Sequence, residues 1–138
     1  MAEALILDSE ALNALANPAQ RGVLALRARA IARVAHERGA LVRVPSPVLA
    51  EVCRGGRLDA PINQFLSRDV VRVVELTRTI AQRAGSLLAA ARMSSAHAVD
   101  AFVVATALEF ELALIASGDL KDIKRLAANH PQVSVLAL

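Results

Sequence analysis

Residues 4–9 of the sequence read ALILDS, four apolar side chains followed directly by two polar ones. A short apolar run bounded by polar residues is typical of a buried strand. We therefore predict a strand over residues 4–7 that ends at Asp8, and a helix over residues 9–15 behind it. Because open α/β sheets carry their sites beyond the carboxyl ends of strands, Asp8 is the first candidate functional residue.

The rest of the chain alternates short apolar runs with longer segments of helical periodicity. We predict further strands over residues 41–44, 70–74, 112–115 and 133–136. Helices are predicted between them, over residues 20–38, 46–51, 59–66, 77–92, 96–110 and 119–128. Apolar strands separated by helices favour an α/β fold with three layers, in which helices flank a mainly parallel central sheet of four to five strands.

Length and composition restrict the class of protein further. The 138 residues indicate a single domain over residues 1–138, and a hydrophobic content of 55% excludes a disordered chain. No apolar run is long enough to span a membrane, and the first residues lack the basic region of a signal peptide, so we expect a cytoplasmic protein. The single cysteine, Cys53, excludes a disulfide framework and a cysteine zinc cluster.

The charged and aromatic residues bear on possible partners. The net charge is only +3, but nearly all cations are arginines, which bind phosphate in a bidentate fork. A genome rich in G and C would produce the same arginine and alanine bias, so this signal for a phosphate-bearing partner is weak. With three Phe and no Trp or Tyr, the chain lacks the aromatic platform on which single-stranded nucleic acid stacks.

Three further acids fall where a sheet edge could gather them around Asp8. Asp119 follows the strand over residues 112–115, and the two acids converge if these strands are neighbours. Glu51 lies in the helix after the second strand, for which Ser46 is the expected N-cap. Asp100 interrupts an apolar helical segment, and a carboxylate there is costly to bury unless it is paired, hydrogen-bonded or bound to metal.

Each acid also has a simpler explanation. Asp8 and Asp119 could each cap the helix that follows them, and Asp122 would add favourable charge at the start of the last helix. Glu51 alone could be a solvated helix residue. Asp100 resists such an explanation, because capping does not account for an acid within a helix. The prediction of a site therefore rests on the four acids together.

Clustered carboxylates repel one another, and a divalent cation relieves that repulsion. Ligands that are all oxygen select hard ions such as Mg²⁺ or Mn²⁺ over zinc. A metal held by carboxylates can activate water and neutralise the charge that develops on a phosphodiester. The four acids thus predict a metal-dependent hydrolase acting on phosphodiester bonds.

Four segments together resemble the PIN-domain family, and within it the VapC-type toxins of bacterial toxin–antitoxin pairs. They are residues 5–9, 45–51, 95–107 and 114–122, and the last contains SGDLKD, which is similar to the Thr/Ser-x-Asp-x-x-Asp signature of the family. The resemblance covers essentially the whole chain. It departs from many relatives in the long arginine-rich helix over residues 20–38.

The resemblance implies roles for individual residues. The metal-binding and catalytic acids would be Asp8, Glu51, Asp100 and Asp119, and the accessory residues would be Asp122, Ser117 and Ser9. It also implies cleavage of RNA by an Mg²⁺- or Mn²⁺-dependent endoribonuclease, a homodimer, and a small antitoxin protein that covers the groove.

Two other classes of function compete with this interpretation. A catalytically silent PIN-like module would bind RNA or a protein without cleaving, although all four acids are present. Another doubly wound aspartate protein is disfavoured, because Asp8 is followed by Ser9 and Glu10 and not by the Asp-x-Asp of a phosphatase. The sequence also lacks a glycine-rich phosphate loop, which disfavours binding of a nucleotide cofactor.

Overall fold

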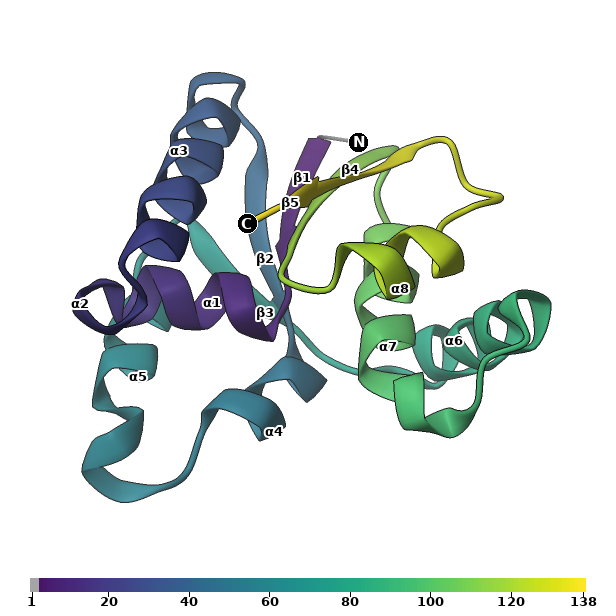
Figure 1. The fold of residues 1–138 in the computed structure, drawn as a ribbon, viewed down its shortest axis with the longest axis horizontal. Coiled ribbons are helices and arrows are strands. Elements are labelled where there is room, and N and C mark those ends of the chain that lie inside the picture. Colours follow the sequence, from purple (N-terminus) through teal and green to yellow (C-terminus); the bar gives the residue numbers. More distant parts are fainter. Residues whose placement is uncertain (1–2) are drawn as a thin grey trace.

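The computed structural model describes residues 3–138 and shows a five-stranded, fully parallel sheet covered by helices on both faces (Figure 1). The strand order is β3-β2-β1-β4-β5, so β1 lies at the centre between β2 and β4. The predicted α/β fold with a flanked, mainly parallel sheet is confirmed. The strands are β1 (Glu3–Leu7), β2 (Leu41–Pro45), β3 (Val71–Val74), β4 (Leu112–Ser117) and β5 (Val133–Ala137).

Helices connect every pair of consecutive strands. Figure 1 shows α1, α3 and α5 on one side of the sheet and α6, α7 and α8 on the other. The α-helices are α1 (Ser9–Ala16), α2 (Pro18–Arg21), α3 (Val23–Glu37), α4 (Leu49–Val52), α5 (Ala60–Leu66), α6 (Arg78–Ala91), α7 (Ala98–Ala107) and α8 (Leu120–Leu126). Three 3-10 turns precede α4, α5 and α7, at Ser46–Val48, Gly56–Asp59 and Ser95–His97. No helix in residues 3–138 is long and apolar enough to cross a membrane.

The chain changes direction in the sheet at β1, which fixes where a site can form. Leu5 pairs with Val42 of β2 on one side and with Leu114 of β4 on the other. The connections from β1 through β2 to β3 run towards one edge, and β4 and β5 occupy the opposite edge. This switch point places the residues after β1 and β4 side by side, as the sequence predicted for Asp8 and Asp119.

Three predicted helices differ from those observed. The helix predicted over residues 46–51 is a 3-10 turn over Ser46–Val48 and α-helical only from Leu49. The arginine-rich segment, predicted as one helix over residues 20–38, is broken at Gly22, whose φ of 50° is accessible to glycine at little cost. The helix predicted over residues 96–110 starts as a 3-10 turn and becomes α-helical only at Ala98. Asp100 consequently lies in the first turn of α7 and not in its middle, at the end where the helix dipole favours an acid.

The core is centred on β1, where Ala4, Leu5 and Ile6 are fully buried and Leu7 is nearly so. A strand that is apolar on both faces requires a helical layer on each side. Leu12 of α1 and Val103 of α7 are also fully buried within this same core. The carboxyl end of β1 is therefore held in place from both faces.

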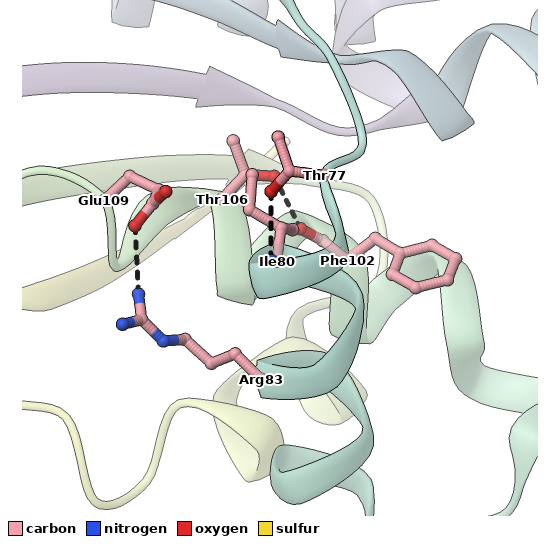
Figure 2. A network of polar contacts seen from close by, with 6 residues as sticks. All are labelled: Thr77, Ile80, Arg83, Phe102, Thr106 and Glu109. Carbon is pink, nitrogen blue, oxygen red and sulfur yellow. Dashed lines mark hydrogen bonds and ion pairs between the residues drawn. The ribbon is translucent and has the colours of Figure 1, made fainter.

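Helix α7 carries Asp100, and an ion pair supplements its apolar packing against α6 (Figure 2). Arg83 of α6 donates to the Glu109 carboxylate at 3.1 Å, just beyond the end of α7. Thr77 caps α6 by accepting from the Ile80 amide at 3.1 Å. The ion pair is partly solvated and contributes at most about 1 kcal/mol, so the position of α7 depends mainly on its buried apolar face.

Ile6→Ala tests the central role of β1. Truncating this fully buried side chain should lower the free energy of unfolding by about 2–5 kcal/mol, because it removes apolar contact and leaves a cavity. Leu58→Ala, at a residue that is 72% exposed in the 3-10 turn before α5, should change it by no more than about 0.5 kcal/mol. Urea denaturation followed by circular dichroism measures both, and equal effects would contradict the assignment of the core.

Candidate metal centre at the carboxyl edge of the sheet

All four acids predicted from the sequence line one cavity of about 280 Å³ beyond the carboxyl ends of β1 and β4. They come from four separate segments: the end of β1, helix α4, helix α7 and the turn after β4. The complete lining is Asp8, Ser9, Glu10, Glu51, Val99, Asp100, Val103 and Asp119. The fold therefore gathers residues that are up to 111 positions apart in the chain (119 − 8 = 111).

Asp8 is the most buried of these acids, with 6% of its surface exposed. One carboxylate oxygen accepts from the Ala11 amide at 2.9 Å and caps α1, and the other accepts from the Gly118 amide at 3.1 Å. Burial raises the pKa of Asp8 above its ordinary value, although hydrogen bonds from Ser117, Ala11 and Gly118 oppose that shift. The sequence left helix capping and a place in the site as alternative roles for Asp8. In the structure Asp8 has both roles.

In the turn after β4, side-chain oxygens also accept hydrogen bonds from backbone amides. The Ser117 hydroxyl is fully buried and accepts from the Asp119 amide at 2.8 Å. Asp119 caps α8 by accepting from the Asp122 amide at 3.4 Å, and it also lines the cavity. Asp122 is absent from the cavity lining and lies one helical turn further along α8.

Glu51 reaches the cavity from the opposite wall. It is exposed, and its carboxylate accepts a short hydrogen bond from the Ser9 hydroxyl, which links α4 to the start of α1. The expected N-cap role of Ser46 is wrong: the 3-10 turn there has no side-chain cap. Its hydroxyl instead accepts from the Leu76 amide at 3.0 Å, so Ser46 ties the ends of β2 and β3 together beside the site.

Asp100 is half-buried, and its pKa is raised from 3.8 to about 6. Loss of hydration is the main cause, followed by repulsion from Asp119, Asp8, Asp122 and Glu51. One carboxyl group thus experiences the charge of every other predicted acid. A bound cation would relieve both effects.

Two residues near the cavity were not among the predicted site residues. Glu10 lines it from the first turn of α1, two positions after Asp8, and adds to the repulsion on that carboxylate. His97 lies on the 3-10 turn before α7, with its Nδ1 atom 3.4 Å from an Asp122 carboxylate oxygen. Its position three residues before Asp100, one helical turn away, is the sequence signal that singles it out among the three histidines.

Gly118 lets α1 approach the turn after β4. A Cβ atom at this position would lie 2.5 Å from Cγ of Glu10 and 2.8 Å from its Cβ. Both distances are far below van der Waals contact, and atoms so near the backbone cannot swing away freely. The absence of a side chain at position 118 therefore allows Asp8 and Asp119 to converge.

The donor set fits a hard divalent cation. Carboxylates from Asp8, Glu51, Asp100 and Asp119 border one open cavity, and oxygen ligands of this kind are preferred by Mg²⁺ and Mn²⁺. The raised pKa of Asp100 shows that the acids are close enough to penalise one another when ionised. A cation is the ordinary means of compensating such a cluster.

The fold and the site together define the class of protein. It is a doubly wound α/β protein whose carboxylates gather in a pocket at the switch point of the sheet. The sequence matches the PIN domain over residues 5–129, so the chain belongs to the PIN-domain family. The fold is similar to that in the crystal structure of VapBC2 from Rickettsia felis bound to a DNA fragment from their promoter. The TM-score is 0.63, with 14% sequence identity over 97% of this chain and 98% of the other, a likeness of fold alone. No curated protein matches the sequence significantly.

Asp100→Asn tests the electrostatic strain in the cavity without divalent ions. The folded protein holds this proton more tightly than the unfolded chain, so the contribution of Asp100 to stability is fully present below about pH 4 and is lost as the pH rises through about 6. Asparagine does not ionise, so the variant does not lose this stability as the pH rises. After a discount for the half-exposed carboxyl, the variant should gain about 1 kcal/mol at pH 8, or about 3 °C in Tm.

The gain should disappear near pH 4, where the wild-type carboxyl is protonated. Thermal melts in EDTA from pH 4 to 8 measure it, with Asp69→Asn, an exposed acid just before β3, as the control. A variant that is destabilised at every pH would refute the assigned strain.

Gly118→Ala tests the close approach to Glu10. The added methyl group should cost about 1–3 kcal/mol in the free energy of unfolding, because α1 or the turn must shift. Gly85→Ala is the matched control: no atom lies within 4 Å of its Cβ position, and it sits within α6. Alanine there should stabilise the protein by up to about 1 kcal/mol. Chemical denaturation should therefore give effects of opposite sign.

Proposed function

We propose that this PIN-domain protein is a metal-dependent endoribonuclease, the toxin of a toxin–antitoxin pair. The observation that carries the proposal is the convergence of Asp8, Glu51, Asp100 and Asp119 on one cavity. Membership of the PIN-domain family and the shared fold with VapBC2 support it.

In this proposal the four acids hold Mg²⁺ or Mn²⁺. A bound divalent ion supplies Lewis-acid stabilisation of the phosphodiester and favours deprotonation of the attacking water. Asp8 is oriented by the Ala11 and Gly118 amides, and Ser117 holds the backbone that presents Asp119. The Ser9 hydroxyl donates a hydrogen bond to the Glu51 carboxylate and so fixes its position.

The negative charge of the cavity gives a reason why hydrolysis of RNA here would need a cation. Hydrolysis of an RNA phosphodiester places additional negative charge near carboxylates that already repel one another, and a bound cation would offset it. The acids alone would repel the RNA backbone. The chain therefore needs metal for binding as well as for chemistry, and removal of metal should abolish both.

We propose two protein partners for the toxin. A small antitoxin protein would cover the acidic cavity, and the similarity to VapBC2 supports such an assembly. A second copy of the chain would form a homodimer. Helix α3 offers apolar surface for a protein contact, because Val23, Leu26 and Val34 are 65%, 66% and 49% exposed along it.

RNA cleavage tests the function directly. The purified protein should cleave RNA within total RNA in the presence of Mg²⁺ or Mn²⁺ and not in EDTA. Asp100→Asn should slow cleavage by about 100-fold or more, because the metal contributes several kcal/mol of charge stabilisation. Asp69→Asn, outside the cavity, should cleave at the wild-type rate.

Mapping the RNA ends by sequencing would identify the target. Equal cleavage by wild type and Asp100→Asn would overturn the enzymatic role of the cavity. Binding of RNA without any metal-dependent cleavage would favour the silent module instead.

A further inference from the structure

A second group of potential metal ligands lies next to the four-acid cavity. One ligand atom each from His97, Asp100 and Asp122 falls within 4.8 Å of the other two. His97 Nδ1 and the nearer Asp122 oxygen are 3.4 Å apart. Two adjacent ligands of an ion bound at about 2.1 Å lie about 3.0 Å apart, and opposite ligands about 4.2 Å. The three side chains therefore need only small adjustments to share one ion.

Helix geometry explains why these residues converge. His97 and Asp100 are three positions apart, across the junction of the 3-10 turn with α7. Asp119 and Asp122 have the same spacing, across the start of α8. His97 and Asp119 are the N-caps of α7 and α8, and Asp100 and Asp122 lie in the first turns of these helices. The contact of His97 with Asp122 joins the two helix starts, and α7 packs against α8. Asp100 and Asp119 line the cavity, whereas His97 and Asp122 lie one turn away from it.

We propose that His97, Asp100 and Asp122 form a second divalent-cation site that selects a transition-metal ion such as Mn²⁺ over Mg²⁺. It adjoins the metal centre of the proposed function through Asp100, which both sites share. Three protein ligands leave positions open for water, as in catalytic metal sites. All three side chains are partly buried, so an ion can enter from solvent without full loss of hydration.

The imidazole determines the selectivity. Mg²⁺ requires oxygen ligands and releases its waters reluctantly, whereas imidazole nitrogen binds first-row transition metals. The four-acid cavity has oxygen donors only and accepts Mg²⁺ or Mn²⁺. A protein with both sites would hold Mn²⁺ at the histidine site even in excess Mg²⁺.

A simpler role for His97 is an ion pair with Asp122 that joins the 3-10 turn to α8. That role requires a protonated imidazole, which donates through Nδ1 and cannot bind metal through it. The two roles predict different spectra. Only metal binding places the histidine nitrogen in the coordination sphere of the ion.

Electron paramagnetic resonance with Mn²⁺ as the probe tests the proposal on the full chain. Titration should show two bound equivalents in the wild type. Pulsed spectra should show nitrogen coupling that persists in excess Mg²⁺. His97→Gln should lose the coupling and weaken the second site by at least about 10-fold. His130→Gln, at another partly exposed histidine that lines two other cavities without His97, Asp100 or Asp122, should retain both properties.

Wild-type protein without nitrogen coupling to any bound Mn²⁺, or coupling unchanged in His97→Gln, would overturn the proposal. Because the wild-type signal is itself decisive, the test does not depend on the folding of the variant. The outcome is also separable from that of the proposed function. Nitrogen coupling without RNA cleavage would retain the site and refute the ribonuclease, and cleavage without coupling would do the reverse.

Discussion

The Asp8 carboxylate joins three parts of the chain that are remote in sequence. It ends the central strand, caps the helix that follows, and accepts from the backbone of the turn after β4. Each oxygen receives one amide N–H, which partly compensates for the loss of water around a side chain that is 6% exposed. Together with the hydrogen bond from Ser117, these two bonds offset part of the cost of burying the acid. Without Asp8, the strand, the helix and the turn would lose their common point of attachment.

The site combines well-satisfied hydrogen bonds with unfavourable charge. No buried side-chain nitrogen or oxygen among the described residues lacks a hydrogen-bond partner, and Asp8, Glu51 and Asp119 each accept a hydrogen bond at the site. The carboxylates nevertheless raise the pKa of Asp100, whose ionised form is disfavoured by its neighbours. This combination is characteristic of functional sites, where shifted pKa values cluster. A preorganised site binds a cation without a large change in the protein.

The sequence predicted the sheet and its four converging acids. Short apolar runs indicate strands, and acids that follow strands lie at one edge of a parallel sheet. The contacts it missed join segments that are distant in the sequence. Nothing near Gly118 in the sequence indicates that Glu10 will lie against it, and nothing near Ser46 indicates its bond to Leu76. The bend at Gly22 was missed because the periodicity on both sides of it is helical. Tertiary packing decided the contacts of Gly118 and Ser46, whereas the bend at Gly22 uses a positive φ that glycine adopts at little cost.

The double role of Asp8 has an evolutionary consequence. Selection for a stable fold and selection for an acidic pocket act on the same carboxylate at position 8. By contrast, Glu51 is exposed and accepts from the Ser9 hydroxyl, so its loss disturbs little of the fold. A descendant that no longer needed the pocket would lose Glu51 early and retain Asp8. An intact Asp8 therefore reflects the needs of the fold, and Glu51 on α4 is the better indicator that the pocket is still in use.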